Sequence, residues 1–206
     1  MTDITIYTIH NEHTRFLDLG WMKYAMPQRW ERAQRFVREQ DKLLCLGAGY
    51  LLRNVADIES ESELNLTKNG KPIAVSKADF SLAHSGERSA IVINNGKIGL
   101  DIEKIENEFP QEAQMIFTEE EKTFCRKAPN PNICAYQLWT MKESVLKAIG
   151  LGFSFDPASF CVLPAFSKEP VKIGENVWHI ACGVFDGYSC SVCREKPINE
   201  INWIEI

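Results

Sequence analysis

The sequence has no excess of positive charge. Its 23 lysines and arginines are outnumbered by 28 aspartates and glutamates, which gives a formal net charge of -5. Nucleic acids and anionic membranes attract proteins mainly through Lys and Arg, so we expect neither partner, and any anion site must be local. The chain also lacks a run of about 18 apolar residues. Its first residues do not show a basic segment followed by an apolar run. These absences predict a cytoplasmic protein with no membrane span.

Cysteine is present in a number and arrangement that exclude a disulfide framework. The seven cysteines are odd in number and scattered along the chain. Cys190 and Cys193 form a single C-x-x-C with no second pair to complete a zinc site. Residues 188–193 alternate like a strand, which places these two thiols on opposite faces. We predict ordinary buried, reduced cysteines.

The chain contains a regular succession of strand and helix patterns. With 206 residues, of which 45% are hydrophobic, it can form one domain or two small packed halves. Alternating apolar residues predict strands at residues 3–9, 80–85, 89–94, 97–103, 159–163, 177–185 and 188–193. Helices are predicted twice within residues 27–56, once from residue 118 and once over residues 131–149. Residues 57–70 are polar and predict a loop or a short strand.

Local signals fix several element ends. Thr118 and Glu121 form a capping box, and Asn130 with Pro131 suits the start of the next helix. Gly150 predicts where that helix stops. Asn95-Gly96 predicts a hairpin between the strands on either side. The order of elements indicates an α+β protein of two halves that meet near residue 99, divided as 1–99 and 100–206.

Two acids stand close together at the predicted end of a strand. Asp101 and Glu103 are two residues apart, so their carboxylates share one face, about 6 to 7 Å apart along the strand, opposite Ile98 and Leu100. A pair of this kind alone is more often solvated than metal-binding.

The helix at 131–149 adds further charged groups. Trp139, Glu143 and Lys147 are spaced by four and lie on one stripe, which alone is typical of a surface ion pair beside a core tryptophan. Mg²⁺ is held by a few carboxylates and phosphate oxygens, and lysine binds phosphate as a point charge. Three acids with one lysine therefore predict a magnesium–pyrophosphate site formed by Asp101, Glu103 and Glu143.

These residues lie in two motifs that resemble those of a known family. W-T-M-K-E-S-x-x-K at residues 139–147 and I-G-L-D-I-E at residues 98–103 are similar to the two signatures of the 4′-phosphopantetheinyl transferases, in particular the long, surfactin-synthetase-activating type. Smaller matches are G-K-P at 70–72, A-H-S-G at 83–86, F-T-x-x-E at 117–121 and P-A-S-F at 157–160. The resemblance is firm over about residues 70–160.

The resemblance implies a fold and a reaction. It implies two similar α+β halves about a pseudo-twofold axis, with coenzyme A bound in the cleft between them and a monomeric protein. The serine hydroxyl of an apo acyl or peptidyl carrier protein would attack the β-phosphorus and release adenosine 3′,5′-bisphosphate. Asp101, Glu103 and Glu143 would hold Mg²⁺, and Lys147 would contact a phosphate. A carboxylate must take the serine proton; we favour Glu143, with Glu103 as the other candidate.

The resemblance also implies nucleotide contacts. His84 matches a histidine on the 3′-phosphate, Ser85 belongs to the same motif, and Lys71 matches a lysine near the nucleotide. Ala83 replaces the usual serine before that histidine. Arg29 and Arg32 align with basic residues for the 3′-phosphate, and Lys42 is a further candidate, although a solvated basic face explains Arg29 and Arg32 equally well.

Three functional classes stay open from the sequence. A transferase would need a surface for the carrier protein, for which Phe109 and Met115 are candidates, whereas core packing is the default for Ile116 and Phe117. A magnesium-dependent nucleotide pyrophosphatase could use the same acids with water as the acceptor. A non-enzymatic coenzyme A-binding module is disfavoured because every expected metal ligand is present.

Overall fold

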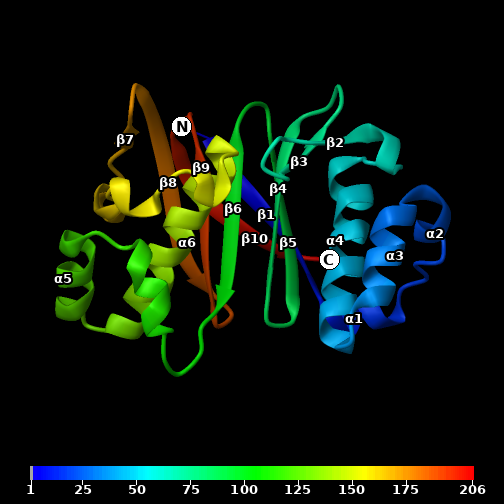
Figure 1. Ribbon diagram of the computed structural model, residues 1–206, viewed down its shortest axis with the longest axis horizontal. Helices are drawn as coiled ribbons and strands as arrows, with labels where there is room; N and C mark the ends of the chain where they lie inside the picture. Colours follow the sequence, from blue (N-terminus) through cyan, green and yellow to red (C-terminus); the bar gives the residue numbers. More distant parts are fainter. Residues whose placement is uncertain (1) are drawn as a thin grey trace.

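A computed structural model describes residues 2–206, apart from the side chains of Thr2 and Phe153. Two four-stranded sheets pack face to face in the middle of the molecule, and helices cover their outer faces (Figure 1). The first sheet has the order β10-β1-β5-β4, made of β10 (Ile198–Glu205), β1 (Thr2–His10), β5 (Arg88–Asn94) and β4 (Asp79–Ser85). The second has the order β6-β9-β8-β7, made of β6 (Ile98–Lys104), β9 (Tyr188–Arg194), β8 (Asn176–Phe185) and β7 (Val171–Ile173).

The helices divide between the two outer faces. The helices on the first sheet's side are α1 (Asn11–Phe16), α2 (Met22–Ala25), α3 (Pro27–Arg35) and α4 (Glu39–Ala56). Those on the second sheet's side are α5 (Glu119–Lys127) and α6 (Pro131–Ile149). The small hairpin consists of β2 (Leu64–Leu66) and β3 (Pro72–Ala74). Short 3₁₀ turns are η1 (Glu61–Glu63), η2 (Gln111–Ile116), η3 (Gly152–Ser154), η4 (Pro157–Ser159) and η5 (Leu163–Ser167). Within residues 2–206 no helix combines the length and apolar character needed to cross a membrane.

The core follows from strand alternation. Ile98, Leu100 and Ile102 of β6 point inward and pack on Ala90 and Val92 of β5, which forms the core between the sheets. The opposite face of β6 lies against α6. Cys190 and Cys193 of β9 belong to the cores on opposite sides of the second sheet, and both are free thiols, as predicted.

The two sheets meet along β4 and β6 through side chains of β4. Asp79, Ser81 and Ser85 accept hydrogen bonds from the backbone N–H groups of Ile98, Leu100 and Lys104, at 3.3, 2.9 and 3.0 Å. These bonds satisfy backbone N–H groups on the edge of β6 that are not paired with a neighbouring strand. The edge of the second sheet is therefore covered and not exposed. We call this line of contacts the seam.

The locally signalled helices agree with prediction. Residues 27–56 form two helices, α3 and α4. Thr118 and Glu121 make both bonds of the capping box of α5, Asn130 caps α6, and Gly150 ends α6 in the left-handed conformation. The strands at residues 3–9, 80–85, 89–94, 97–103, 177–185 and 188–193 also form.

The predicted hairpin at Asn95-Gly96 is wrong. β5 pairs with β1 and β4, whereas β6 pairs with β9, so the turn carries the chain from one sheet to the other. Gly96 uses a positive φ of 120° there, but a turn signal does not specify which strand becomes the partner. The hairpin that β5 forms is instead with the preceding strand, β4.

The strand predicted at residues 159–163 is also wrong. This segment lies between and within the turns η4 and η5. Its backbone groups are bound by side chains, because the Phe160 carbonyl accepts from Lys142 Nζ at 2.6 Å and the Val162 N–H donates to Glu121 Oε1 at 2.8 Å. A sheet ladder is therefore not needed to satisfy them.

Three strands have no counterpart among the predictions: β3, β7 and β10. β10 returns to the first sheet and pairs in parallel with β1. The last strand of the chain thus lies in the sheet built mainly from the first hundred residues (Figure 1). The division into halves at residues 99 and 100 stays a prediction.

Candidate active site

Gly99 sets how closely β6 approaches α6. A Cβ atom at this position would overlap the Ser144 carbonyl and crowd the Ala148 N–H, both on the helix backbone. Glycine therefore allows a close strand–helix contact that a side chain would prevent. Asp101 and Glu103 follow on the same face of β6, so both carboxylates are directed toward α6.

Asp101 is the buried member of the group. It is 5% exposed, and its Oδ1 lies 2.7 Å from Lys147 Nζ. Its Oδ2 has no hydrogen-bond partner among the described residues. Burial raises the pKa of Asp101, and the charge of Lys147 acts in the opposite direction. A buried carboxylate with one free oxygen is a site that a second cation would stabilise.

Glu103 and Glu143 share an unusual electrostatic environment. Burial, followed by repulsion from Asp101, raises the pKa of Glu103 to about 7, with hydrogen bonds from Ser85 and Trp139 opposing the shift. Burial and then repulsion from Asp101 also raise the pKa of Glu143 to about 7, and Glu103 adds to that repulsion. The charges of the three carboxylates therefore repel one another.

These residues suit a hard divalent cation in their chemistry. The free Oδ2 of Asp101 and the mutual repulsion of three carboxylates are features that Mg²⁺ would relieve. Within residues 2–206, however, no three His, Cys, Asp or Glu side chains are already gathered at ligand spacing. Lys147 supplies the positive charge at Asp101 in this structure.

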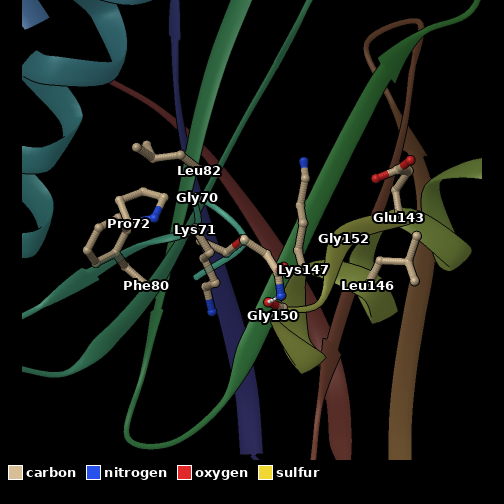
Figure 2. Close-up of a pocket in the computed structure, with 12 residues that line it drawn as sticks. Gly70, Lys71, Pro72, Phe80, Leu82, Glu143, Leu146, Lys147, Gly150 and Gly152 are labelled. Atoms are coloured by element: carbon tan, nitrogen blue, oxygen red, sulfur yellow. Dashed lines mark hydrogen bonds between the residues drawn. The ribbon is translucent and has the colours of Figure 1, made fainter. Parts of the chain in front are cut away.

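Two cavities open on either side of the carboxylates. The first, about 280 Å³, is lined by Glu143 and Lys147 of α6 and, across from them, by Lys71 and Leu82 (Figure 2). The Asn69 side chain donates to the Gly150 carbonyl at 3.2 Å, which holds the β2–β3 turn against the end of α6.

The second cavity has a different character. It measures about 340 Å³, and its lining includes Ser85, Glu103, Phe109, Tyr136 and Trp139. Glu143 thus faces a cavity whose lining is mainly apolar, and Glu103 faces the aromatic-walled one.

His84 lies where basic groups from three elements gather. It is exposed on β4. Partial desolvation, and then the charges of Lys147 and Arg32, lower the pKa of His84, with Asp41 opposing them. The structure therefore brings His84, Arg32 and Lys147 of the predicted nucleotide contacts into one electrostatic neighbourhood.

The other predicted nucleotide contacts have protein partners or lie elsewhere. Lys71 Nζ lies 3.1 Å from Asp79 Oδ2 and 3.0 Å from the Ile98 carbonyl. Arg29 donates to the Cys45 carbonyl at 3.3 Å, and burial lowers the pKa of its guanidinium. Lys42 is half-buried on α4. Lys71 and Arg29 would have to exchange these partners to reach a ligand.

Two features of the site have no counterpart in the sequence-based predictions. Ser85 donates to Glu103 Oε2 at 2.6 Å. Lys142 and Glu121 form an ion pair at 2.9 Å with both side chains 0% exposed. Lys142 also donates to the Pro157 carbonyl at 2.8 Å. In the sequence, the signal for Lys142 is its place next to Glu143 in the motif. Adjacent residues of a helix point in different directions, so this place does not predict what Lys142 contacts.

The segment after β6 divides between core and surface. Phe109 is buried against Tyr136, with ring centroids 4.9 Å apart, and Phe117 is also in the core. Ile116 packs partly against the same core, whereas Met115 is 78% exposed. Met115 is therefore the member of this set that a partner could contact.

Comparison with known proteins identifies the class to which this site belongs. Residues 97–193 match the model of the 4′-phosphopantetheinyl transferase superfamily. The chain is 33% identical to the 4′-phosphopantetheinyl transferase gsp of Aneurinibacillus migulanus, over 94% of this chain and 86% of that protein. It is 27% identical to the 4′-phosphopantetheinyl transferase Sfp of Bacillus subtilis, over 86% of this chain and 85% of that protein.

A solved structure shows a more distant likeness. The holo-[acyl-carrier-protein] synthase of Thermotoga maritima is 15% identical, with a TM-score of 0.36, over 47% of this chain and 61% of that one. The family assignment rests on the relatives that match most of this chain. The chain belongs to the 4′-phosphopantetheinyl transferase superfamily, and it is an enzyme of that class.

Proposed function

We propose that this enzyme transfers the 4′-phosphopantetheine group of coenzyme A to a serine of an apo acyl or peptidyl carrier protein, with Mg²⁺, and releases adenosine 3′,5′-bisphosphate. The observation that supports it most is the Asp101–Lys147 pair with Glu103 and Glu143 beside it, between two cavities. Phosphoryl transfer needs positioning and charge neutralisation more than covalent help from the protein, and this group of residues supplies both.

The metal role would fall to Asp101, Glu103 and Glu143. When bound there, Mg²⁺ would neutralise the charge on the pyrophosphate. Lys147 Nζ, already at the edge of the first cavity, would bind a phosphate oxygen as a point charge. His84 and Arg32 would receive the 3′-phosphate, and Arg29, Lys42 and Lys71 are further candidates for the nucleotide.

The proton of the carrier serine would pass to a carboxylate. Glu143 and Glu103 are the candidates, because each lines a cavity beside Asp101. We favour Glu143 because it lines the same cavity as Lys147, with Glu103 as the alternative. The carrier would approach over the aromatic cavity and the exposed Met115. The cytoplasmic location and the monomeric state stay predictions.

The reaction can be tested by product analysis. An apo carrier protein is incubated with coenzyme A, Mg²⁺ and the enzyme, and intact-mass spectrometry follows the carrier while chromatography follows the nucleotides. The proposal expects one phosphopantetheine on the carrier for each adenosine 3′,5′-bisphosphate released. Consumption of coenzyme A with an unmodified carrier would instead establish a pyrophosphatase.

A further inference from the structure

Ser85 makes two hydrogen bonds whose directions are fixed by chemistry. Its Oγ accepts from the backbone N–H of Lys104 at 3.0 Å and lies 2.6 Å from Glu103 Oε2. The backbone N–H can only donate, so it uses an acceptor position of the Ser85 hydroxyl and leaves the hydroxyl proton free for Glu103 Oε2. The single hydroxyl proton of Ser85 is therefore directed at Glu103.

The turn that follows Ser85 holds this geometry in place. Gly86 has a φ of +55°, and a Cβ there would lie 2.7 Å from Lys104 Cδ and 2.8 Å from Tyr188 Oη. Lys104 Nζ in turn lies 2.9 Å from Glu87 Oε2. The β4–β5 turn is thus packed tightly on the side chain of Lys104, the residue after Glu103, and the Lys104 N–H bond holds the Ser85 hydroxyl beside Glu103.

Ser85 is directed away from the expected nucleotide contacts. Successive side chains of a strand point to opposite sides, so Ser85 and His84 cannot face the same ligand group in β4. His84 lies with Arg32 and Lys147, whereas Ser85 lines the aromatic cavity with Glu103. The family resemblance assigns Ser85 to the nucleotide, and the geometry points elsewhere.

We propose that Ser85 is a positioning residue, which orients the Glu103 carboxylate as a ligand for the divalent cation and does not bind the nucleotide. This inference rests on the proposed function, because Glu103 is a ligand only there. Without the Ser85 donor, Glu103 would keep its repulsion from Asp101 but lose a bond that selects one carboxylate orientation. Removing a hydrogen bond to a metal ligand typically costs about 10- to 100-fold in metal affinity.

The seam provides a matched control. Ser81 Oγ accepts from the Leu100 N–H at 2.9 Å, the same kind of bond that Ser85 makes to Lys104. Among residues 2–206, no carboxylate is hydrogen-bonded to the Ser81 hydroxyl. Ser81→Ala therefore removes the seam bond alone, and Ser85→Ala removes the seam bond and the bond to Glu103. Ser85→Thr keeps the hydroxyl.

The experiment measures two dissociation constants for the wild type and these three variants. Mn²⁺ alone is titrated with detection of the free ion by electron paramagnetic resonance, and coenzyme A is titrated calorimetrically with a chelator present. We expect Ser85→Ala to weaken Mn²⁺ binding about 10- to 100-fold, with metal-free coenzyme A affinity within about twofold. Ser85→Thr and Ser81→Ala should bind Mn²⁺ like the wild type, and thermal unfolding checks that all are folded.

The opposite results each have a distinct meaning. Unchanged Mn²⁺ affinity with weakened coenzyme A binding in Ser85→Ala would restore the nucleotide role and overturn the inference. Equal loss of Mn²⁺ affinity in Ser81→Ala and Ser85→Ala would reduce Ser85 to a seam residue and overturn it too. If the wild type bound no Mn²⁺, the metal part of the proposed function would fall along with the role of Ser85.

Discussion

At the scale of single residues, the site is a set of like charges kept close together. Asp101 is buried, Lys147 is its counter-charge among the described residues, and both neighbouring glutamates have a pKa of about 7. Such repulsion is unfavourable in the free protein and is relieved by a cation, so it is typical of a functional site rather than of a stabilising network.

The choice between Glu143 and Glu103 as the proton acceptor can be made with two amide variants. Glu143→Gln is expected to lower kcat by about 10²- to 10⁴-fold at saturating Mg²⁺, since a missing base is not replaced by more metal. Glu103→Gln should recover part of its activity as Mg²⁺ is raised. Steady-state rates over a Mg²⁺ series make the distinction, and the reverse pattern would make Glu103 the base.

At the scale of elements, the position of α6 depends on contacts on both of its sides. One contact is with the face of β6 that carries its glycine, where strand and helix backbones approach closely. The other is the buried Lys142 ammonium, which ties α6 to α5 through Glu121 and to the 157–160 segment through two carbonyls. Glu143 lies between these contacts in sequence, so changes on either side of α6 are expected to reach it.

The buried ion pair gives a stability prediction. Lys142→Met leaves the Glu121 carboxylate without its counter-charge in a site that is 0% exposed. Removing one partner of such a pair costs about 3 to 5 kcal/mol of unfolding free energy. Urea unfolding measures the cost. Lys142→Met combined with Glu121→Gln should be less destabilised than Lys142→Met alone, and equal values would show that the charge is not the cause.

Gly99 gives a second prediction for the helix. Gly99→Ala places a Cβ against the Ser144 carbonyl, which is backbone and cannot rotate away, so α6 must move. We expect a loss of about 1 to 3 kcal/mol in stability together with a marked loss of transfer activity. Ala90→Gly, on the inner core of the first sheet, is a control that perturbs stability without moving α6. Full activity in Gly99→Ala would mean that the close approach is not needed.

The sequence predicts those elements whose signals are local. The ends of α5 and α6 follow from Thr118, Asn130 and Gly150, each of which acts on its own helix. The pairing of β6 with β9, and of β10 with β1, depends on contacts between distant parts of the chain that no turn signal contains. For the same reason, alternation places Asp101 and Glu103 on one face, but only the fold reveals the Asp101–Lys147 pair and the direction of Ser85.

At the scale of the whole molecule, the site lies between two layers, the second sheet and the helix that covers it. β6 contributes Asp101 and Glu103, and α6 contributes Glu143 and Lys147. The seam holds β4, and with it His84 and Ser85, beside β6. The stability of the fold and the protonation of the carboxylates are therefore linked.

This linkage predicts a dependence on pH. The folded-state pKa values of Glu103 and Glu143 are raised from 4.5 to about 7, so between these values the folded state holds protons that the unfolded state has lost. Their contribution to stability is thus lost as pH rises from about 4.5 to about 7, by up to about 3 kcal/mol for each group. Chemical unfolding across this range should show a steeper fall in the wild type than in Glu103→Gln/Glu143→Gln, and Mg²⁺ should reduce the difference. Parallel curves would contradict the raised values.

The central claim is that the three carboxylates hold a divalent cation that the transfer requires. Its most direct test is the rate of carrier modification, followed by intact mass at fixed coenzyme A while Mg²⁺ is titrated, for the wild type and Asp101→Asn. We predict that the wild type reaches a plateau with Mg²⁺ and stops with a chelator, and that folded Asp101→Asn transfers at least about 100-fold more slowly. Equal rates with and without the chelator, or a normal rate in Asp101→Asn, would contradict it.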